Sequence, residues 1–255
     1  MTIRLATQTR NDLATEFKDA FDGGVIRIFT GPQPIGADSA ETGTLLGIVT
    51  KASGAHTAEV SAVGSLTIAG TSGSVDTVTV NAIDILGGSV ASTGAVNTTA
   101  DAVAAKINTN PKNHLFTAST TGASGVITLT AVKGLGTLPN TWAVSGTYTT
   151  ITGGTYVAMT GGVDQVNGLV FGTPANGTVP KHATDVWSFL GLAQGTAGWF
   201  RLAGGVADGG GASSVLPRLD GSIGTANADL NLSNIAIDVN TPVTIDTFSF
   251  TVPAA

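Results

Sequence analysis

The sequence predicts a mainly β protein, and three observations lead to that prediction. Only 11% of its 255 residues are charged and 5% are aromatic, whereas 35 are glycine. Threonine, serine, alanine and valine are abundant. β-Branched residues suit pleated sheets, and glycine suits the turns between short strands. Short segments with apolar residues at alternate positions recur towards both ends of the chain. A chain of this length can form one large domain or two smaller ones.

The N-terminal segment predicts one helix followed by two strands. We expect the helix over 9–21, with Thr9 as its N-cap and Asp12 three residues later, a spacing typical of a capping box. The apolar stripe of this helix consists of Leu13, Phe17 and Phe21. Two glycines end the helix at 23–24. The strands are expected at 25–29 and 43–50.

The middle of the chain has a different composition and predicts a separate small domain over 51–164. Serine, glycine, alanine and threonine dominate from Lys51 to Gly73, and glycine and threonine dominate over 146–162, so we expect both stretches to be flanks of this domain. The helix is expected over 100–108, capped by Thr98 or Thr99. The order is strand, strand, helix, strand, strand, which is a ββαββ pattern of the α+β class. The expected strands are 75–80, 83–86, 115–119 and 126–130, with a last one at 142–144.

The C-terminal part returns to alternating strands, and its densest set of large apolar residues lies over 185–218. Trp187 and Trp199 fall in two short strands separated by small residues at 193–198. We therefore expect a hairpin that supplies the largest side chains to one core. Other strands are expected at 168–171, 220–223, 230–237 and 243–252. The candidate residues for core or assembly contacts are Trp187, Phe189, Trp199, Phe200, Arg201, Arg218 and Phe248.

The two ends of the chain are expected to fold together. Residues 1–50 and 165–255 would form a discontinuous, jelly-roll-like β-sandwich with the short N-terminal helix, and 51–164 would be inserted between two of its strands. Such insertions are tolerated where the ends of a loop lie close together at a surface.

No catalytic, cofactor or metal site is expected. The three histidines, His56, His114 and His182, lie far apart, and nucleophile-elbow, P-loop and dinucleotide motifs are lacking. The C-terminal aspartates lack EF-hand spacing, and turn capping explains them better than metal binding or catalysis. We therefore expect a protein that is not an enzyme, since a hydrolase would need paired carboxylates in a cleft. These aspartates are Asp208, Asp220, Asp229, Asp238 and Asp246.

Two arginines and three tryptophans have specific interpretations. Arg201 and Arg218 are each expected to pair with a carboxylate, either across the sandwich or at a subunit contact, with a structural salt bridge favoured. Trp187 and Trp199 could stack on sugar rings, but their place in alternating strands favours core packing. Trp142 is expected to anchor the core of the middle domain.

Charge and cysteine content exclude several classes of partner. The net charge of −6 and the scattering of 11 basic residues exclude a phosphate-binding surface, so no nucleic acid is expected. Without cysteine, stability has to come from packing or from assembly with other subunits. The opening MTIRLATQTRNDL lacks the apolar core of a secretory signal, and a run of about 18 apolar residues occurs nowhere. We expect a soluble protein made in the cytoplasm, with no membrane partner.

The two ends of the chain also resemble a family of small structural proteins of tailed-bacteriophage particles. The opening resemblance lies in FKDAFDGGVIRIFTG at 17–31 and AETGTLL at 40–46. The closing resemblance lies in TAGWFRL at 196–202, PRLDGSIG at 217–224, ADLNL at 228–232 and TIDTF at 244–248. Many members of that family lack a middle domain, and the resemblance covers about half of this chain. The middle domain, over 75–145, is similar to domains found within phage tail and baseplate proteins.

This resemblance implies a non-enzymatic virion component assembled in the host cytoplasm. A capsid decoration or head–tail collar protein is the preferred role, because a projecting middle domain suits surface display, and a tail or baseplate component is the alternative. The expected partners are further copies of the chain, with a trimer as the working assumption, and phage capsid, collar or tail proteins. A glycan-binding adhesin for host recognition is the alternative from another class.

Overall fold

The computed structural model describes residues 4–122, 124–151 and 153–254, so the first three residues of the opening segment lie outside it. The described chain is mainly β and contains two helices, which confirms the predicted fold class at that level. It divides into two compact units. Unit 1 comprises Met1–Ala58 and Gln165–Ala255, and unit 2 comprises Glu59–Asp164.

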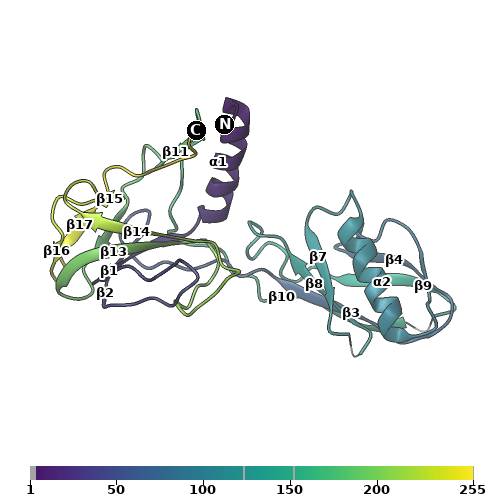
Figure 1. The fold of residues 1–255 in the computed structure, drawn as a ribbon. Coiled ribbons are helices and arrows are strands. Elements are labelled where there is room, and N and C mark those ends of the chain that lie inside the picture. Colours follow the sequence, from purple (N-terminus) through teal and green to yellow (C-terminus); the bar gives the residue numbers. More distant parts are fainter. Residues whose placement is uncertain (1–3, 123, 152, 255) are drawn as a thin grey trace. The chain divides into compact units, whose positions relative to one another are not determined.

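Unit 1 is built on a six-stranded sheet in the order β15-β14-β13-β1-β2, with β16 pairing the start of β13 (Figure 1). Two short ladders, β11 with β18 and β12 with β17, complete its β structure among the described residues. The elements of unit 1 are α1 (Thr7–Phe21), β1 (Val25–Thr30), β2 (Leu45–Val49), β11 (Thr178–Pro180), β12 (Ser188–Leu190), β13 (Gly195–Ala203), β14 (Arg218–Gly224), β15 (Leu230–Asn231), β16 (Ala236–Ile237), β17 (Pro242–Thr244) and β18 (Ser249–Thr251).

Helix α1 differs from its prediction at the cap and in its buried face. Ala6 is the N-cap and no side chain caps the helix, so the predicted capping by Thr9 is wrong. Leu13 is 48% exposed, whereas Ala14 is fully buried. The packed face follows the helical 3,4 spacing from Ala14 through Phe17 to Phe21, which turns Leu13 towards solvent. The Phe17 ring stacks on Phe250, with centroids 3.9 Å apart.

The predicted hairpin between the two tryptophan segments does not form. Strand β12 pairs with β17, whereas β13 lies between β1 and β14, so each strand has a partner distant in sequence. The predicted strand at 168–171 is also wrong, since Phe171 makes only an isolated bridge to Lys181. The apolar core of unit 1 nevertheless includes Trp187, Phe189 and Phe200.

The segment 51–58 belongs to unit 1 although its composition resembles that of unit 2. The N–H of Lys51 donates to the carbonyl of Asn167 at 3.2 Å. Thr57 and Val166 form an antiparallel bridge with two backbone hydrogen bonds, of 3.1 and 3.0 Å. The chain therefore leaves unit 1 and returns to it at adjacent, hydrogen-bonded positions.

Unit 2 contains two four-stranded sheets, one in the order β10-β3-β8-β7 and one in which β5, β6 and β9 pair with β4. Helix α2 packs against β7, β3 and β8 (Figure 1). The elements of unit 2 are β3 (Val63–Ile68), β4 (Ser74–Val80), β5 (Ile83–Asp84), β6 (Val90–Ala91), α2 (Val96–Thr109), β7 (Phe116–Thr120), β8 (Val126–Ala131), β9 (Val144–Thr149) and β10 (Gly153–Thr160).

Both stretches expected as flanks of the middle domain contain strands of its main sheet. Strand β3 lies between β8 and β10, with Leu66 and Ile68 buried and threonine or serine at the alternate positions. The small-residue composition concealed this alternation. Helix α2 begins earlier than expected, after Ala95, so Thr99 lies inside the helix. Trp142 is partly buried and meets Phe116 edge to face at 6.2 Å.

Candidate functional site

The central strands of unit 1 carry different chemistry on their two faces. Alternate residues of a strand point to opposite sides, so Phe200 and Leu202 of β13 enter the apolar core while Trp199 and Arg201 face the other way. On that second face Trp199 is fully buried and stacks on Phe29 of β1, with ring centroids 4.5 Å apart. Both faces of β13 are therefore covered.

Arg201 is the centre of the second face and has an exposure of 0%. Its Nε and Nη2 donate to the two carboxylate oxygens of Asp220 on β14, each at 2.7 Å, and its Nη1 donates to the carbonyl of Ser39 at 2.9 Å. The guanidinium carbon lies 5.6 Å from the centre of the Trp199 ring, a cation–π geometry. The salt bridge predicted for Arg201 is thus present, but its carboxylate, Asp220, lies on the neighbouring strand of the same sheet and not across the sandwich.

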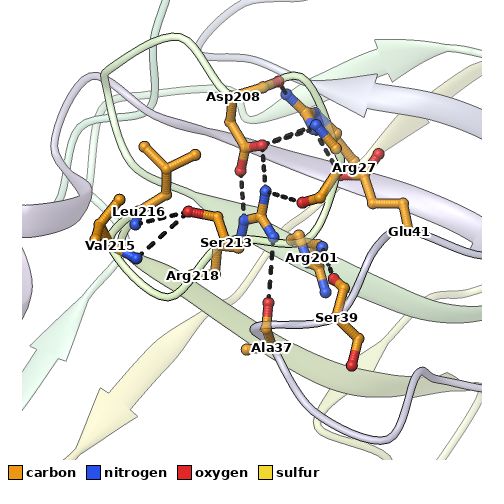
Figure 2. Close-up of polar contacts among 12 residues, drawn as sticks. Arg27, Ala37, Ser39, Glu41, Arg201, Asp208, Ser213, Val215, Leu216 and Arg218 are labelled. Atoms are coloured by element: carbon orange, nitrogen blue, oxygen red, sulfur yellow. Dashed lines mark hydrogen bonds and ion pairs between the residues drawn. The ribbon is translucent and has the colours of Figure 1, made fainter.

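Arg218 and Arg27 share a second carboxylate, Asp208, which lies between them (Figure 2). Arg218 donates to both oxygens of Asp208, at 2.6 and 2.8 Å, and Arg27 donates to its backbone carbonyl. Arg27 also pairs with Glu41 at 2.5 Å. Burial raises the pKa of Asp208, but hydrogen bonds from Arg218 and Gly210 and the charges of both arginines outweigh burial, so the pKa lies below its usual value.

This arginine–carboxylate network, consisting of Arg27, Arg201, Arg218, Glu41, Asp208 and Asp220, joins the sheet to two loops. One loop, over 31–44, contributes Glu41 and the carbonyls of Ala37 and Ser39 (Figure 2). The other, over 204–217, contributes Asp208 and the carbonyl of Gly211. Three positive and three negative charges balance within the network. Its bidentate ion pairs suit positioning of the loops rather than proton transfer.

The two loops also bind each other and expose apolar side chains. The N–H of Ser213 donates to the carbonyl of Asp38 at 2.9 Å, and the N–H of Glu41 donates to the carbonyl of Gly210 at 2.9 Å. Ile35 is fully exposed at 103%, and Val215 is 87% exposed. The two loops, joined by these hydrogen bonds, thus each present a large aliphatic side chain to solvent.

The remaining candidate residues from the sequence lie in the apolar core on the other face. Trp187 meets Phe171 edge to face at 5.1 Å and lies 5.7 Å from Phe248. Trp187 and Trp199 both have 0% exposure, so neither can stack on a sugar ring. The structure therefore brings Arg201, Arg218 and Trp199 together on one face and separates them from Trp187 and Phe248.

The three histidines make separate contacts and share no hydrogen-bond partner among the described residues. His56 contacts the carbonyl of Gly23 at 3.0 Å, His182 lies near Asp185, and His114 belongs to unit 2. Among the described residues, no group of three or more histidines or carboxylates could hold a metal ion. Turn capping is confirmed for Asp208, whose Oδ1 accepts from the N–H of Gly210 at 2.8 Å in addition to its pairing with Arg218. Asp220 instead pairs with Arg201.

Arg27 and Glu41 belong to the network but were not singled out from the sequence. The alternation of residues in strand β1 could have indicated that Arg27 is buried. Arg27 lies between Val25 and Phe29 on one face of the strand, and Ile26 and Ile28 lie on the other face. A charged residue flanked on its own face by apolar ones implies a covered face, and a covered arginine needs a carboxylate partner.

Neither helix in the described part of the chain is long and apolar enough to span a membrane. Comparisons of the chain with protein-family models, with curated proteins and with solved structures gave no match.

Proposed function

We propose that this protein is a non-enzymatic structural component of a tailed-bacteriophage particle, in the role of a capsid decoration or head–tail collar protein. The proposal combines the resemblance of the two chain ends to phage virion proteins with the geometry of the arginine–carboxylate network. The protein would be assembled into virions in the host cytoplasm, in contact with further copies of itself and with capsid or collar proteins.

The observation that carries the proposal is the pair of loops that expose Ile35 and Val215. Holding an aliphatic side chain in water brings no benefit to an isolated chain, whereas a docking partner would bury it at a gain of about 1.5–3 kcal/mol per side chain. Because the network fixes both loops, little conformational entropy would be lost on docking. The segments GPQPIG at 31–36 and ASSVL at 212–216 carry no charge, so the partner surface is expected to be apolar protein.

We also propose a more specific architecture for each of the two units. We assign unit 1 as a jelly-roll-like β-sandwich, with the six-stranded sheet as one layer and the β11–β18 and β12–β17 ladders in the other. The single apolar core that contains Phe200 from the first layer and Phe189 from the second supports this assignment. Unit 2 is assigned as an inserted α+β module for display. Its continuity in sequence between two halves of unit 1 supports that assignment.

The test is to locate the chain in particles of the phage that encodes it. Antibodies against the purified protein should label intact, density-banded particles at the capsid surface or the neck. Labelling confined to the tail or baseplate would favour the alternative role. Recovery of the protein only in the unassembled fraction would contradict the proposal.

A variant pair then tests the docking surface. The double variant Ile35→Asp with Val215→Asp should fold normally, because both side chains are exposed, but should be lost from purified particles. The control is Leu138→Asp in unit 2, which charges another exposed aliphatic position, 62% exposed, and should still be incorporated. Equal incorporation of all three proteins would exclude the loop pair as the docking surface.

A further inference from the structure

Unit 1 contains a cleft of about 480 Å³ that the proposed virion role does not use. Three segments line it, namely Pro180–Ala183 at the end of β11, the vicinity of β15 with Asp229 and Asn231, and Asp246–Ser249 leading into β18. Its volume falls in the range of about 300–1,000 Å³ that is usual for small-molecule sites. A ligand of one or two sugar rings would fit this space.

The apolar part of the cleft wall is rigid. Phe248 is half-buried, and its ring is fixed by Trp187, Phe171 and Phe200, at centroid distances of 5.7, 6.0 and 6.3 Å. Pro180 adds a second apolar group to the lining. A fixed aromatic ring beside polar side chains is a wall against which the C–H face of a sugar can lie.

Two carboxylates supply hydrogen-bond acceptors to the cleft. Oδ2 of Asp229 accepts from the N–H and the hydroxyl of Ser222, at 2.9 and 2.7 Å, and these bonds hold the pKa of Asp229 below its usual value. Its Oδ1 makes no hydrogen bond with any other residue that the structure describes. Asp246 is exposed and makes no hydrogen bond or ion pair with any residue that the structure describes. Both side chains therefore offer carboxylate oxygens to a ligand.

Donors line the same cleft. The exposed hydroxyls of Thr247 and Ser249 make no hydrogen bond to a side chain in the described part of the chain. His182 is oriented through its Nδ1, which lies 3.1 Å from the Thr184 hydroxyl and 3.4 Å from Asp185. That leaves the imidazole Nε2 for a ligand. The cleft lining thus contains donors, acceptors and one aromatic residue.

We propose that this cleft binds a neutral saccharide. A sugar hydroxyl donates one hydrogen bond and accepts others, so it can satisfy a carboxylate and a neighbouring hydroxyl or imidazole at the same time. The aromatic wall matches the less polar face of the ring. The lining carries two carboxylates and one cation, Lys181, whose Nζ donates to the carbonyl of Asp185, so its net formal charge is negative and disfavours acidic sugars and phosphorylated ligands. The polar lining disfavours lipids. The inference goes beyond the virion role and holds whether or not the chain is a virion protein.

The proposal is tested by NMR titration of the full ¹⁵N-labelled chain. The neutral probes are the methyl glycosides of glucose, galactose, mannose and N-acetylglucosamine. Methyl glucuronide is the acidic probe, because it differs from methyl glucoside only in carrying a carboxylate. Methylamine is the cationic probe. At least one neutral glycoside should shift the backbone amides of Asp246–Ser249, and the glucuronide should not.

The decisive variant is Asp246→Asn, which should weaken binding by about 10- to 100-fold through loss of a charge-assisted hydrogen bond. Because Asp246 is exposed and unpaired, this variant should retain the wild-type spectrum elsewhere. The matched control is Asp38→Asn, the same change at an exposed side chain away from the cleft, which should bind like the wild type. Equal affinity in all three proteins would overturn the proposal. Amide shifts with methylamine alone, or with none of the probes, would overturn it as well.

Discussion

Removing the Arg201 side chain should destabilise unit 1 far more than a surface substitution would. In Arg201→Met the Asp220 carboxylate, 2% exposed, loses both of its 2.7 Å hydrogen bonds and its ion-pair partner. The Ser39 carbonyl also loses its donor. Breaking a buried ion pair on one side costs about 3–5 kcal/mol, so the free energy of unfolding of unit 1 should fall by about that amount.

The assay is urea unfolding followed by tryptophan fluorescence. A Trp142→Phe background removes the signal of unit 2, so that Trp187 and Trp199 report on unit 1 alone. The exposed Arg4, changed to Met in the control, should alter stability by no more than about 0.5 kcal/mol.

A double variant separates the lost pair from the unpaired charge. Arg201→Met combined with Asp220→Leu removes both charges, and apolar replacement of a whole buried pair is often neutral. We therefore expect the double variant to be more stable than Arg201→Met alone. A loss below about 1 kcal/mol in the single variant, or a larger loss in the double variant, would refute the reasoning.

Three further predictions concern pH, packing and domain structure. Charged Asp208, whose pKa is lowered, stabilises the fold above the usual aspartate range and ceases to do so as the pH falls through its lowered pKa. Asp208→Asn should therefore flatten the acid side of a stability–pH profile, and an unchanged slope would contradict this. Gly47→Ala should destabilise by about 1–3 kcal/mol in thermal unfolding, because the new Cβ would lie 2.0 Å from the Phe189 ring, whereas Gly209→Ala meets nothing and should not. Replacing Glu59–Asp164 by a short Gly/Ser linker should leave a soluble protein with the β-type circular dichroism of unit 1, and aggregation would count against independent folding.

The sequence predicted local structure better than it predicted pairing. Strand β1 was expected at 25–29 and occurs at Val25–Thr30, because its alternation and its flanking glycines are local signals. The partner of β12 is β17, some fifty residues away, and nothing within the tryptophan segment encodes that choice. Strand β3 was not predicted because serine and threonine occupy the positions between its buried leucine and isoleucine and their neighbours, and strand β10 was not predicted because Met159 is its one buried residue among those whose burial is described.

The sequence predicted that the arginines form salt bridges, but it did not predict which carboxylates they pair with. The position of Arg201 beside aromatic residues indicated a salt bridge, but which carboxylate would meet it depends on the register of β13 with β14. Asp208 could not be assigned to Arg218 and Arg27 from sequence, because the course of the loop over 204–217 brings it to them. The cleft at Asp246 depends in the same way on three segments distant in sequence.

The bridge between Thr57 and Val166 has an evolutionary consequence. Since those two positions face each other across one ladder step, any foreign polypeptide with neighbouring termini could occupy the same locus without disturbing the scaffold. A single recombination event could therefore replace the inserted domain with another domain or delete it. The same position is also suitable for the engineered insertion of peptides or enzymes.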